Sequence, residues 1–181
     1  MKRNNKTLYT AAFAGLLGFV LFSLLTGCQT MFNRYIGKTV PDPNRISIPE
    51  GKPQSGVWQT KDLSFQYTCL RKSGKLSLTG ELALNESYEQ FEILNYLYLW
   101  VHFLDSQGKI IDSKLALSLT STVAYTGEKK QWSVKTSFEL PVNATAVAFG
   151  YMGRVSQGGD EVPEDGGGGG SNWNFYKSPL T

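Results

Sequence analysis

The side chains with the most distinctive chemistry in this 181-residue chain are two cysteines and a single histidine. Cys28 follows Leu25-Thr26-Gly27 at the end of a short apolar run, whereas Cys69 and His102 lie in stretches with the pattern of strands. A thiol can carry a lipid, bind a metal or act as a nucleophile, and an imidazole can bind a metal or transfer a proton. Which use applies depends on the segment that carries each residue.

The first 27 residues have the pattern of a secretory signal peptide. A positively charged head precedes an apolar middle, residues 11–25, and two small residues stand before Cys28. Leu25-Thr26-Gly27-Cys28 resembles the lipobox of bacterial lipoproteins, in which the cysteine thiol receives a diacylglyceryl group and signal peptidase II cuts before it. The resemblance implies covalent lipid at Cys28, palmitate being a typical acyl chain, and each buried CH₂ contributes about 0.8 kcal/mol to membrane binding.

Two alternatives exist for this segment. An uncut transmembrane helix is one, because no charged residue lies between Lys6 and Arg34, but residues 11–25 fall short of the ~20 apolar residues that span a bilayer. An ordinary signal peptide followed by a chance cysteine is the other, and it leaves the Leu-Thr-Gly context unexplained. We therefore expect a signal peptide over 1–27 and a membrane anchor at Cys28.

The charge balance argues against binding to nucleic acid. Lys2, Arg3 and Lys6 are three of the 18 bases, and none of the 15 acids precedes Cys28, so the rest of the chain has 15 bases and 15 acids. A nucleic-acid binder needs a clustered basic face, and so does a polybasic membrane patch. The residues from Cys28 onward suffice for one ordinary domain with flexible ends.

Residues 28–56 contain four prolines and three glycines without an apolar period. This composition predicts a lipidated N-terminus and a flexible tether, of which a part such as Ile46-Ser47-Ile48 can lie along the domain. With Cys28 lipidated, Cys69 has no partner for a disulfide. Because Cys69 alternates with Phe65 and Tyr67 on one face of a predicted strand, we expect a buried thiol that packs as a small hydrophobe.

From residue 57 onward the apolar residues recur with period two, which predicts strands. Six runs are clear and two are less so: 63–70, 76–84, 93–104, 110–120, 132–140 and 146–155, then 57–60 and 173–176. No window of ten residues after Cys28 has a helical period. The pattern predicts an all-β fold, an antiparallel β-sandwich over 57–181, with a flexible glycine-rich acidic loop at 156–172.

These runs resemble those of immunoglobulin-like and fibronectin-type domains. The segment Leu140-Pro141-Val142-Asn143-Ala144-Thr145-Ala146-Val147-Ala148 is similar to the proline-bearing corner that links the two sheets in fibronectin-type domains. The resemblance implies an immunoglobulin-like sandwich.

No convergent metal or catalytic motif is found. A metal site needs several His, Cys or carboxylate ligands, and a Ser-His-Asp site needs a nucleophile beside the histidine, so we expect His102 to be a structural or surface residue. The acids between 160 and 165 lack the ligand spacing of an EF-hand loop. We expect no catalytic residue, no metal and no cofactor other than the lipid at Cys28.

The feature that could form a binding surface is the aromatic row Tyr96, Tyr98 and Trp100 on the strand predicted over 93–104. The opposite face of that strand carries Leu97, Leu99, Val101 and Phe103, which are the better core candidates. Stacked aromatics on an open sheet face can bind sugars, peptides or another sheet. The alternatives are that the row faces the core, or that it forms ordinary cross-strand pairs.

We therefore expect a lipid-anchored envelope lipoprotein that acts as a non-catalytic binding or assembly module, with an envelope protein or a glycan as partner. A purely structural role is the alternative, and a hydrolase of envelope sugars is another, although the acids are scattered. In the lipoproteins that the lipobox resembles, an aspartate after the cysteine retains the protein at the inner membrane. Gln29 therefore implies the outer membrane, facing the periplasm; in a Gram-positive cell the chain would stay on the outer face of the only membrane.

Overall fold

The computed structural model describes residues 34–88, 90–120, 131–157 and 172–181. The chain divides into two compact units, Met1–Tyr35 and Ile36–Thr181, and all described strands belong to the second. The signal peptide predicted over 1–27, Cys28 and the greater part of the loop predicted over 156–172 lie outside the described residues. In the ranges given, no helix has the length and apolar character that crossing a membrane requires.

The described part of the domain consists of short turns and antiparallel strands, with two single-turn 3₁₀ helices. The elements in chain order are η1 (Asp42–Asn44), β1 (Ile46–Ser47), β2 (Pro53–Gln59), β3 (Leu63–Lys72), β4 (Lys75–Leu84), η2 (Glu86–Tyr88), β5 (Ile93–Leu104), β6 (Ile110–Thr120), β7 (Gln131–Glu139), β8 (Ala146–Ser156) and β9 (Asn172–Lys177). Each of the eight predicted runs lies within or overlaps one of these strands.

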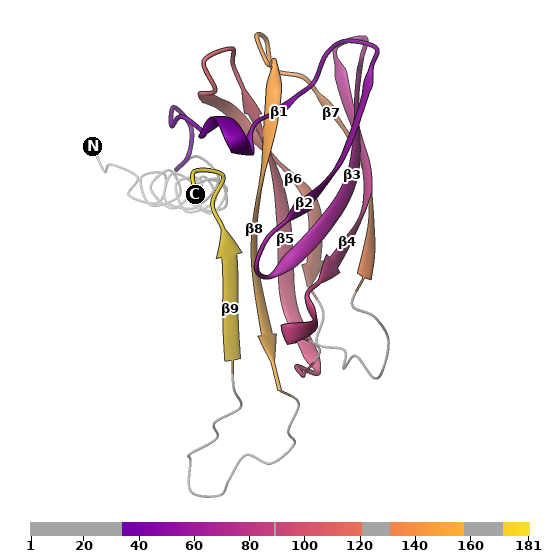
Figure 1. Ribbon diagram of the computed structural model, residues 1–181, viewed down its shortest axis with the longest axis vertical. Coiled ribbons are helices and arrows are strands. Elements are labelled where there is room, and N and C mark those ends of the chain that lie inside the picture. The colour runs from indigo at the N-terminus through magenta and orange to yellow at the C-terminus, as the bar shows by residue number, and fades with distance from the viewer. Residues whose placement is uncertain (1–33, 89, 121–130, 158–171) are drawn as a thin grey trace, which may run out of the picture. The chain divides into compact units, whose positions relative to one another are not determined.

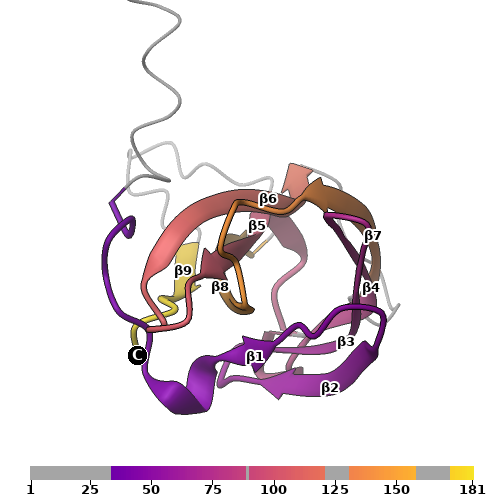
Figure 2. The same ribbon diagram turned by 90° about the horizontal axis from the view of Figure 1, so that it is seen from above.

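The strands form two antiparallel sheets that face each other across one core (Figures 1 and 2). The four-stranded sheet has the order β2-β3-β4-β7. The five-stranded sheet has the order β1-β8-β5-β6, and β9 pairs with β8 beyond the short β1. The predicted all-β architecture of two antiparallel sheets is thus confirmed.

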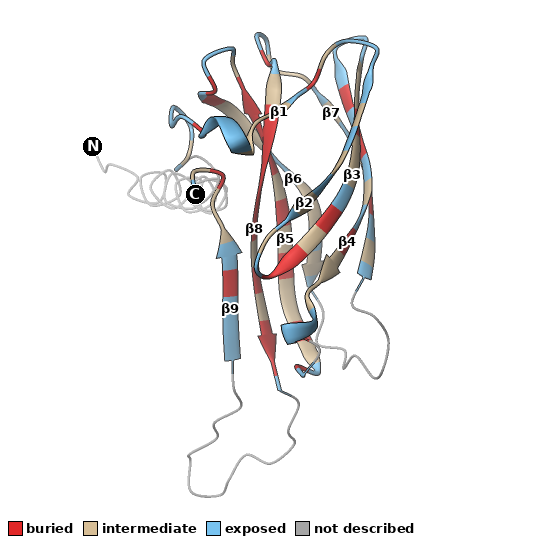
Figure 3. Ribbon diagram, viewed as in Figure 1, coloured by how far each residue is buried: buried red, intermediate tan, exposed pale blue. Residues whose placement is uncertain are grey.

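The period of two in the sequence explains how the core is filled. Phe65 and Cys69 of β3 and Leu78 and Leu82 of β4 point inward and are fully buried. β8 is the most buried strand (Figure 3), because it pairs along its length with β5 and its other edge is covered by β1 and β9. Among the described cysteines, Cys69 is free and buried, as predicted, and burial raises its pKa to about 12.

The β3–β4 connection shows how local sequence sets the register. Ser73 and Gly74 both adopt positive φ, 50° and 74°, so they form the two-residue turn whose twist matches an antiparallel hairpin. Lys72 then pairs with Lys75, and the register continues without a shift to Leu63 and Leu84. This register places the apolar residues of both strands on the same face of the sheet.

The segment before β2 differs from the flexible tether expected over 28–56. The amide of Gly37 donates to the carbonyl of Ile110 at 2.8 Å, and the amide of Val40 donates to the carbonyl of Gly108 at 2.9 Å. Val40 and Ile48 are buried, and β1 pairs with β8. The described residues from Ile36 onward are therefore part of the domain, because buried apolar side chains and backbone pairing hold them against the sheet.

A buried carboxylate joins the two sheets at one end of the core. Asp62, in the β2–β3 turn, is 3% exposed and accepts hydrogen bonds of 2.6 Å from the hydroxyls of Tyr88 and Tyr151. Trp173 of β9 donates to the Tyr88 hydroxyl at 3.2 Å. We call these four residues the Asp62 cluster. Burial, and then the bond to Asp62, raises the pKa of both tyrosines above 10, so both remain donors at neutral pH.

We predict that Asp62→Ala lowers the free energy of unfolding by about 3 kcal/mol, because it removes two hydrogen bonds to a charged acceptor. Tyr151→Phe, which removes one of them, should cost about half as much. Urea unfolding followed by circular dichroism measures both, with the exposed Glu92→Ala as the control. Equal stability of Asp62→Ala and the wild-type protein would show that the cluster contributes nothing.

Candidate functional site

The aromatic row lies on the outer face of the five-stranded sheet. Leu97, Leu99, Val101 and Phe103 are fully buried in the core, so the alternating residues Tyr96, Tyr98 and Trp100 point away from it. These three side chains are half-buried. Of the two orientations that the sequence allowed for this strand, the structure has the one with the aliphatic residues inside.

The rings of the row stand side by side along β5. The ring centroids of Tyr96 and Tyr98 lie 5.4 Å apart with the planes only 20° from parallel, and those of Tyr98 and Trp100 lie 5.9 Å apart at 50°. Because Tyr96 and Tyr98 cover each other's faces, the row offers ring edges and hydroxyl groups outward rather than a flat platform.

Neighbouring strands extend this surface. Tyr98 is opposite Met152 of β8, which is opposite Tyr176 of β9, and Tyr96 is opposite Arg154. Tyr176 is 67% exposed. We call the outward-facing set the aromatic face; its members are Tyr96, Tyr98, Trp100, Met152, Arg154 and Tyr176.

Two polar atoms at the Tyr96 end of the aromatic face have no hydrogen-bond partner among the described residues. They are Nε of Arg154 and Oδ1 of Asn95, and both are buried. Asn95 lies at a β-bulge, where β5 has an extra residue opposite Arg154. A buried donor and a buried acceptor without partners are uncommon, and because neither atom is accessible, a group docked on the aromatic face does not contact them directly.

His102 lies on the same outer face but is covered by the end of the chain. Gly150 leaves room for this: a Cβ there would lie 2.9 Å from Nε2 of His102 and 3.3 Å from Pro179. Pro179 is buried, and Asn44 donates to the carbonyls of Pro179 and Thr181 at 3.4 and 3.0 Å. Residues 178–181 thus cover one half of the outer face, and the aromatic face occupies the other.

The position of His102 makes it a poor general base at neutral pH. Its Nδ1 lies 2.8 Å from Oγ of Ser113, and the residue is 3% exposed. Burial lowers its pKa to about 4, so the ring is neutral at pH 7 and binds a proton weakly. A buried, neutral ring that is hydrogen-bonded to a serine is typical of a structural histidine.

The lowered pKa of His102 leads to a prediction about acid stability. The pKa of His102 is about 4 in the folded protein and has its ordinary value of 6.5 in the unfolded chain. The neutral ring therefore contributes its full stabilisation of the fold above pH 6.5, and this contribution is lost as the pH falls towards 4. Between these values the wild-type protein should lose up to about 3 kcal/mol more than His102→Gln. Urea unfolding at pH 7, 5.5 and 4 measures the difference, and parallel curves would contradict it.

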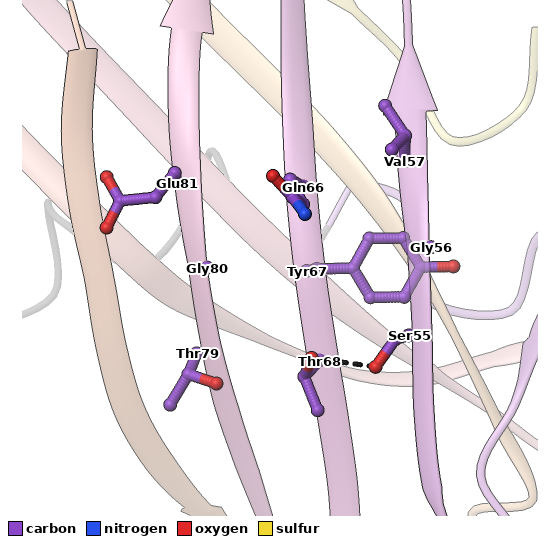
Figure 4. A pocket seen from close by; sticks show the side chains of 9 residues that line it. All are labelled: Ser55, Gly56, Val57, Gln66, Tyr67, Thr68, Thr79, Gly80 and Glu81. Atoms are coloured by element: carbon purple, nitrogen blue, oxygen red, sulfur yellow. Dashed lines mark hydrogen bonds between the residues drawn. The ribbon is translucent and has the colours of Figure 1, made fainter.

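The outer face of the four-stranded sheet has a hollow of about 540 Å³ (Figure 4). Its floor is the row Gly56, Tyr67 and Gly80, in which the Tyr67 ring lies against Gly56. Figure 4 shows hydroxyl side chains on one side of this row and Gln66 and Glu81 on the other. Glu81 is the one carboxylate in the lining and accepts a hydrogen bond from Ser133.

A second hollow, of about 460 Å³, is lined by residues of β6, of β7 and of the segment after β7 and contains two carboxylates. Asp112 forms a salt bridge of 3.0 Å with Lys114, and Glu139 forms one of 2.9 Å with Lys75. Glycoside hydrolysis needs one carboxyl that keeps its proton beside one that does not. Two lysine-paired carboxylates do not provide that arrangement. In the described ranges no three His, Cys, Asp or Glu side chains converge as a metal site would need.

Sequence reasoning located the aromatic row but missed the residues that complete the face. Arg154 is the one charged residue in a long apolar strand, and this was the available signal that the face has a polar end. The bulge at Asn95 and the covering of His102 by residues 178–181 depend on pairing between distant segments.

Comparison with protein-family models, curated proteins and solved structures finds no match for the chain.

Proposed function

We propose that the protein is a lipid-anchored lipoprotein of the cell envelope, attached through Cys28, whose β-sandwich binds a protein partner at the aromatic face. The observation that carries the binding role is the outward row Tyr96, Tyr98 and Trp100 beside Arg154, which forms no salt bridge with the described acids. The lipobox-like Leu25-Thr26-Gly27-Cys28 supports the anchor, and Gln29 supports the outer membrane as its site.

The strand order supports an immunoglobulin-like domain. If β3, β4 and β7 are taken as strands A, B and E, and β5, β6, β8 and β9 as C, C′, F and G, the sheets read A-B-E and C′-C-F-G. This is the grouping of strands in immunoglobulin-like sandwiches. β2 is then an extra strand beside A. Such domains serve many functions, so the proposed role depends on the surface and not on the fold.

The geometry of the row favours a polypeptide over a glycan as the partner. A sugar ring packs best on an open aromatic face, and Tyr96 and Tyr98 have turned their faces to each other. Ring edges, Met152 and tyrosine hydroxyls instead suit the mixed apolar and polar side chains of a protein surface.

Arg154, at the end of the row, indicates one group that this partner supplies. It forms no salt bridge with the described acids, and guanidinium groups bind carboxylates through paired hydrogen bonds. The Arg154 side chain is only partly buried, so an acidic side chain of the partner would pair with its guanidinium. A purely structural lipoprotein is the alternative.

The anchor is tested by Cys28→Ala, with Cys69→Ala as the matched control. Wild-type protein and Cys69→Ala should incorporate labelled palmitate and begin at Cys28, as measured by mass spectrometry of the purified chain. Cys28→Ala should incorporate none, because it has no thiol for the thioether. Label retained in Cys28→Ala would refute the anchor.

The binding role is tested by chemical crosslinking of the full-length protein in its own membrane. Tyr98→Ala should reduce the yield of the partner adduct at least about fivefold, the effect of losing about 1 kcal/mol at an interface. Val57→Ala, which truncates an exposed apolar residue on β2, should leave the yield unchanged. Equal yields from Tyr98→Ala and wild type would remove the aromatic face as the contact, and no adduct from wild type would favour the structural role.

A further inference from the structure

The edge of β9 is the least protected strand edge in the described part of the domain. An edge strand exposes unpaired backbone N–H and C=O groups, and natural proteins protect such edges with prolines, charges, bulges or covering segments. β9 pairs with β8 on one side, and no described residue pairs with its other side.

The other edges each have such a protection. β1 is only two residues long, which leaves little backbone for another strand to pair with. β6 has two register shifts against β5 and carries the Lys114–Asp112 salt bridge, and its start is covered by residues 37–39. β2 begins with Pro53, which has no N–H, and contains Gly56. β7 carries Lys135 and Glu139.

β9 has none of these features over its first five residues. Its sequence Asn-Trp-Asn-Phe-Tyr contains no charge, proline or glycine, and its register against β8 is continuous from Asn172 to Lys177. Trp173 is 56% exposed and Tyr176 is 67% exposed. A flat, uncharged edge with exposed aromatics is the arrangement that favours addition of another strand.

We propose that β9 pairs antiparallel with β9 of a second copy of this chain, so that the two five-stranded sheets become one continuous sheet. A two-fold axis perpendicular to the sheet keeps the outer faces of both copies on the same side, and centring it on Asn174 makes that residue its own partner.

The side chains of β9 are complementary to themselves in this register. Trp173 lies opposite Phe175 of the second copy, and both point to the inner side of the sheet, where Phe175 is buried. Tyr176 lies opposite Asn172, and the two Asn174 amides meet on the outer side. Each opposed pair is therefore aromatic with aromatic, aromatic with amide, or amide with amide, and no like charges are opposed.

The inference goes beyond the proposed binding function and does not depend on it. Tyr176 belongs to both β9 and the aromatic face, but the strand pairing uses the backbone edge of β9 and is measured by a species that contains only this chain. A six-residue strand pair buries less than the ~1,200 Å² typical of stable interfaces, so the pairing is expected to be weak and to need covalent trapping for detection.

The test is crosslinking of full-length Asn174→Cys in its own membrane with a short bis-maleimide. Directly opposed Cβ atoms lie about 5 Å apart, so the engineered thiols should give a species of twice the chain's mass. Val57→Cys, at another exposed site on the protected edge of β2, is the matched control and should stay monomeric. The native Cys69 is buried and does not compete, and Val57→Cys keeps Cys28, so any crosslink through Cys28 also appears in the control.

Adding Tyr176→Lys to Asn174→Cys should reduce the doubled species at least about fivefold, because the lysine places a charge on the edge that must be desolvated. Circular dichroism of this variant checks that the fold is intact. Three results would each overturn the pairing of two copies: as much doubled species from Val57→Cys as from Asn174→Cys, no doubled species from Asn174→Cys, or a crosslink from Asn174→Cys to a different protein instead of a second copy.

Discussion

The packing of the two sheets depends on one buried carboxylate. Asp62 lies in the turn between β2 and β3 of the four-stranded sheet, and the hydroxyl of Tyr151 reaches it from the five-stranded sheet at 2.6 Å. Removing a carboxylate from water is costly, and only hydrogen bonds to both oxygens offset that cost. Tyr88 supplies the second bond, and Trp173 donates in turn to Tyr88. The chain must therefore bring β3, η2, β8 and β9 together in one arrangement, which selects this packing over other apolar ones.

The outer face of the five-stranded sheet has two halves with different chemistry. Residues 178–181 cover His102 and Gly150, so this half behaves as interior, with a neutral histidine of low pKa. The other half keeps its aromatic rings half-exposed and holds Arg154 without a described carboxylate. A single sheet thus combines a sealed region that contributes stability with an open region suited to recognition, and the boundary between them lies near Trp100.

The sequence predicted the strands well because period two is a local signal, and Leu97 to Phe103 show it most clearly. It could not decide which face of β5 is inside, since both faces are apolar and the answer depends on the opposing sheet. The tether was expected to be flexible because Pro41 and Pro43 break any period, with a part such as Ile46-Ser47-Ile48 along the domain. Ile48 is buried, but so is Val40, which no local pattern indicated. Asp62 looked like an ordinary turn residue, because its partners Tyr88 and Tyr151 lie 26 and 89 positions away. Contacts of that kind come from tertiary packing and leave no local trace.

The pairing of residues 37–40 with the β5–β6 hairpin has a mechanical consequence. A pulling force applied at residue 34 acts first on the hydrogen bonds of Gly37 and Val40 to Ile110 and Gly108, and next on the two-residue pairing of β1 with β8. Each of these pairings is only a few residues long, so few hydrogen bonds resist the force there and they break before the longer strand pairs of the two sheets. Residues 34–52 therefore act as a compliant length of chain that extends under tension before the load reaches β2 and the sandwich.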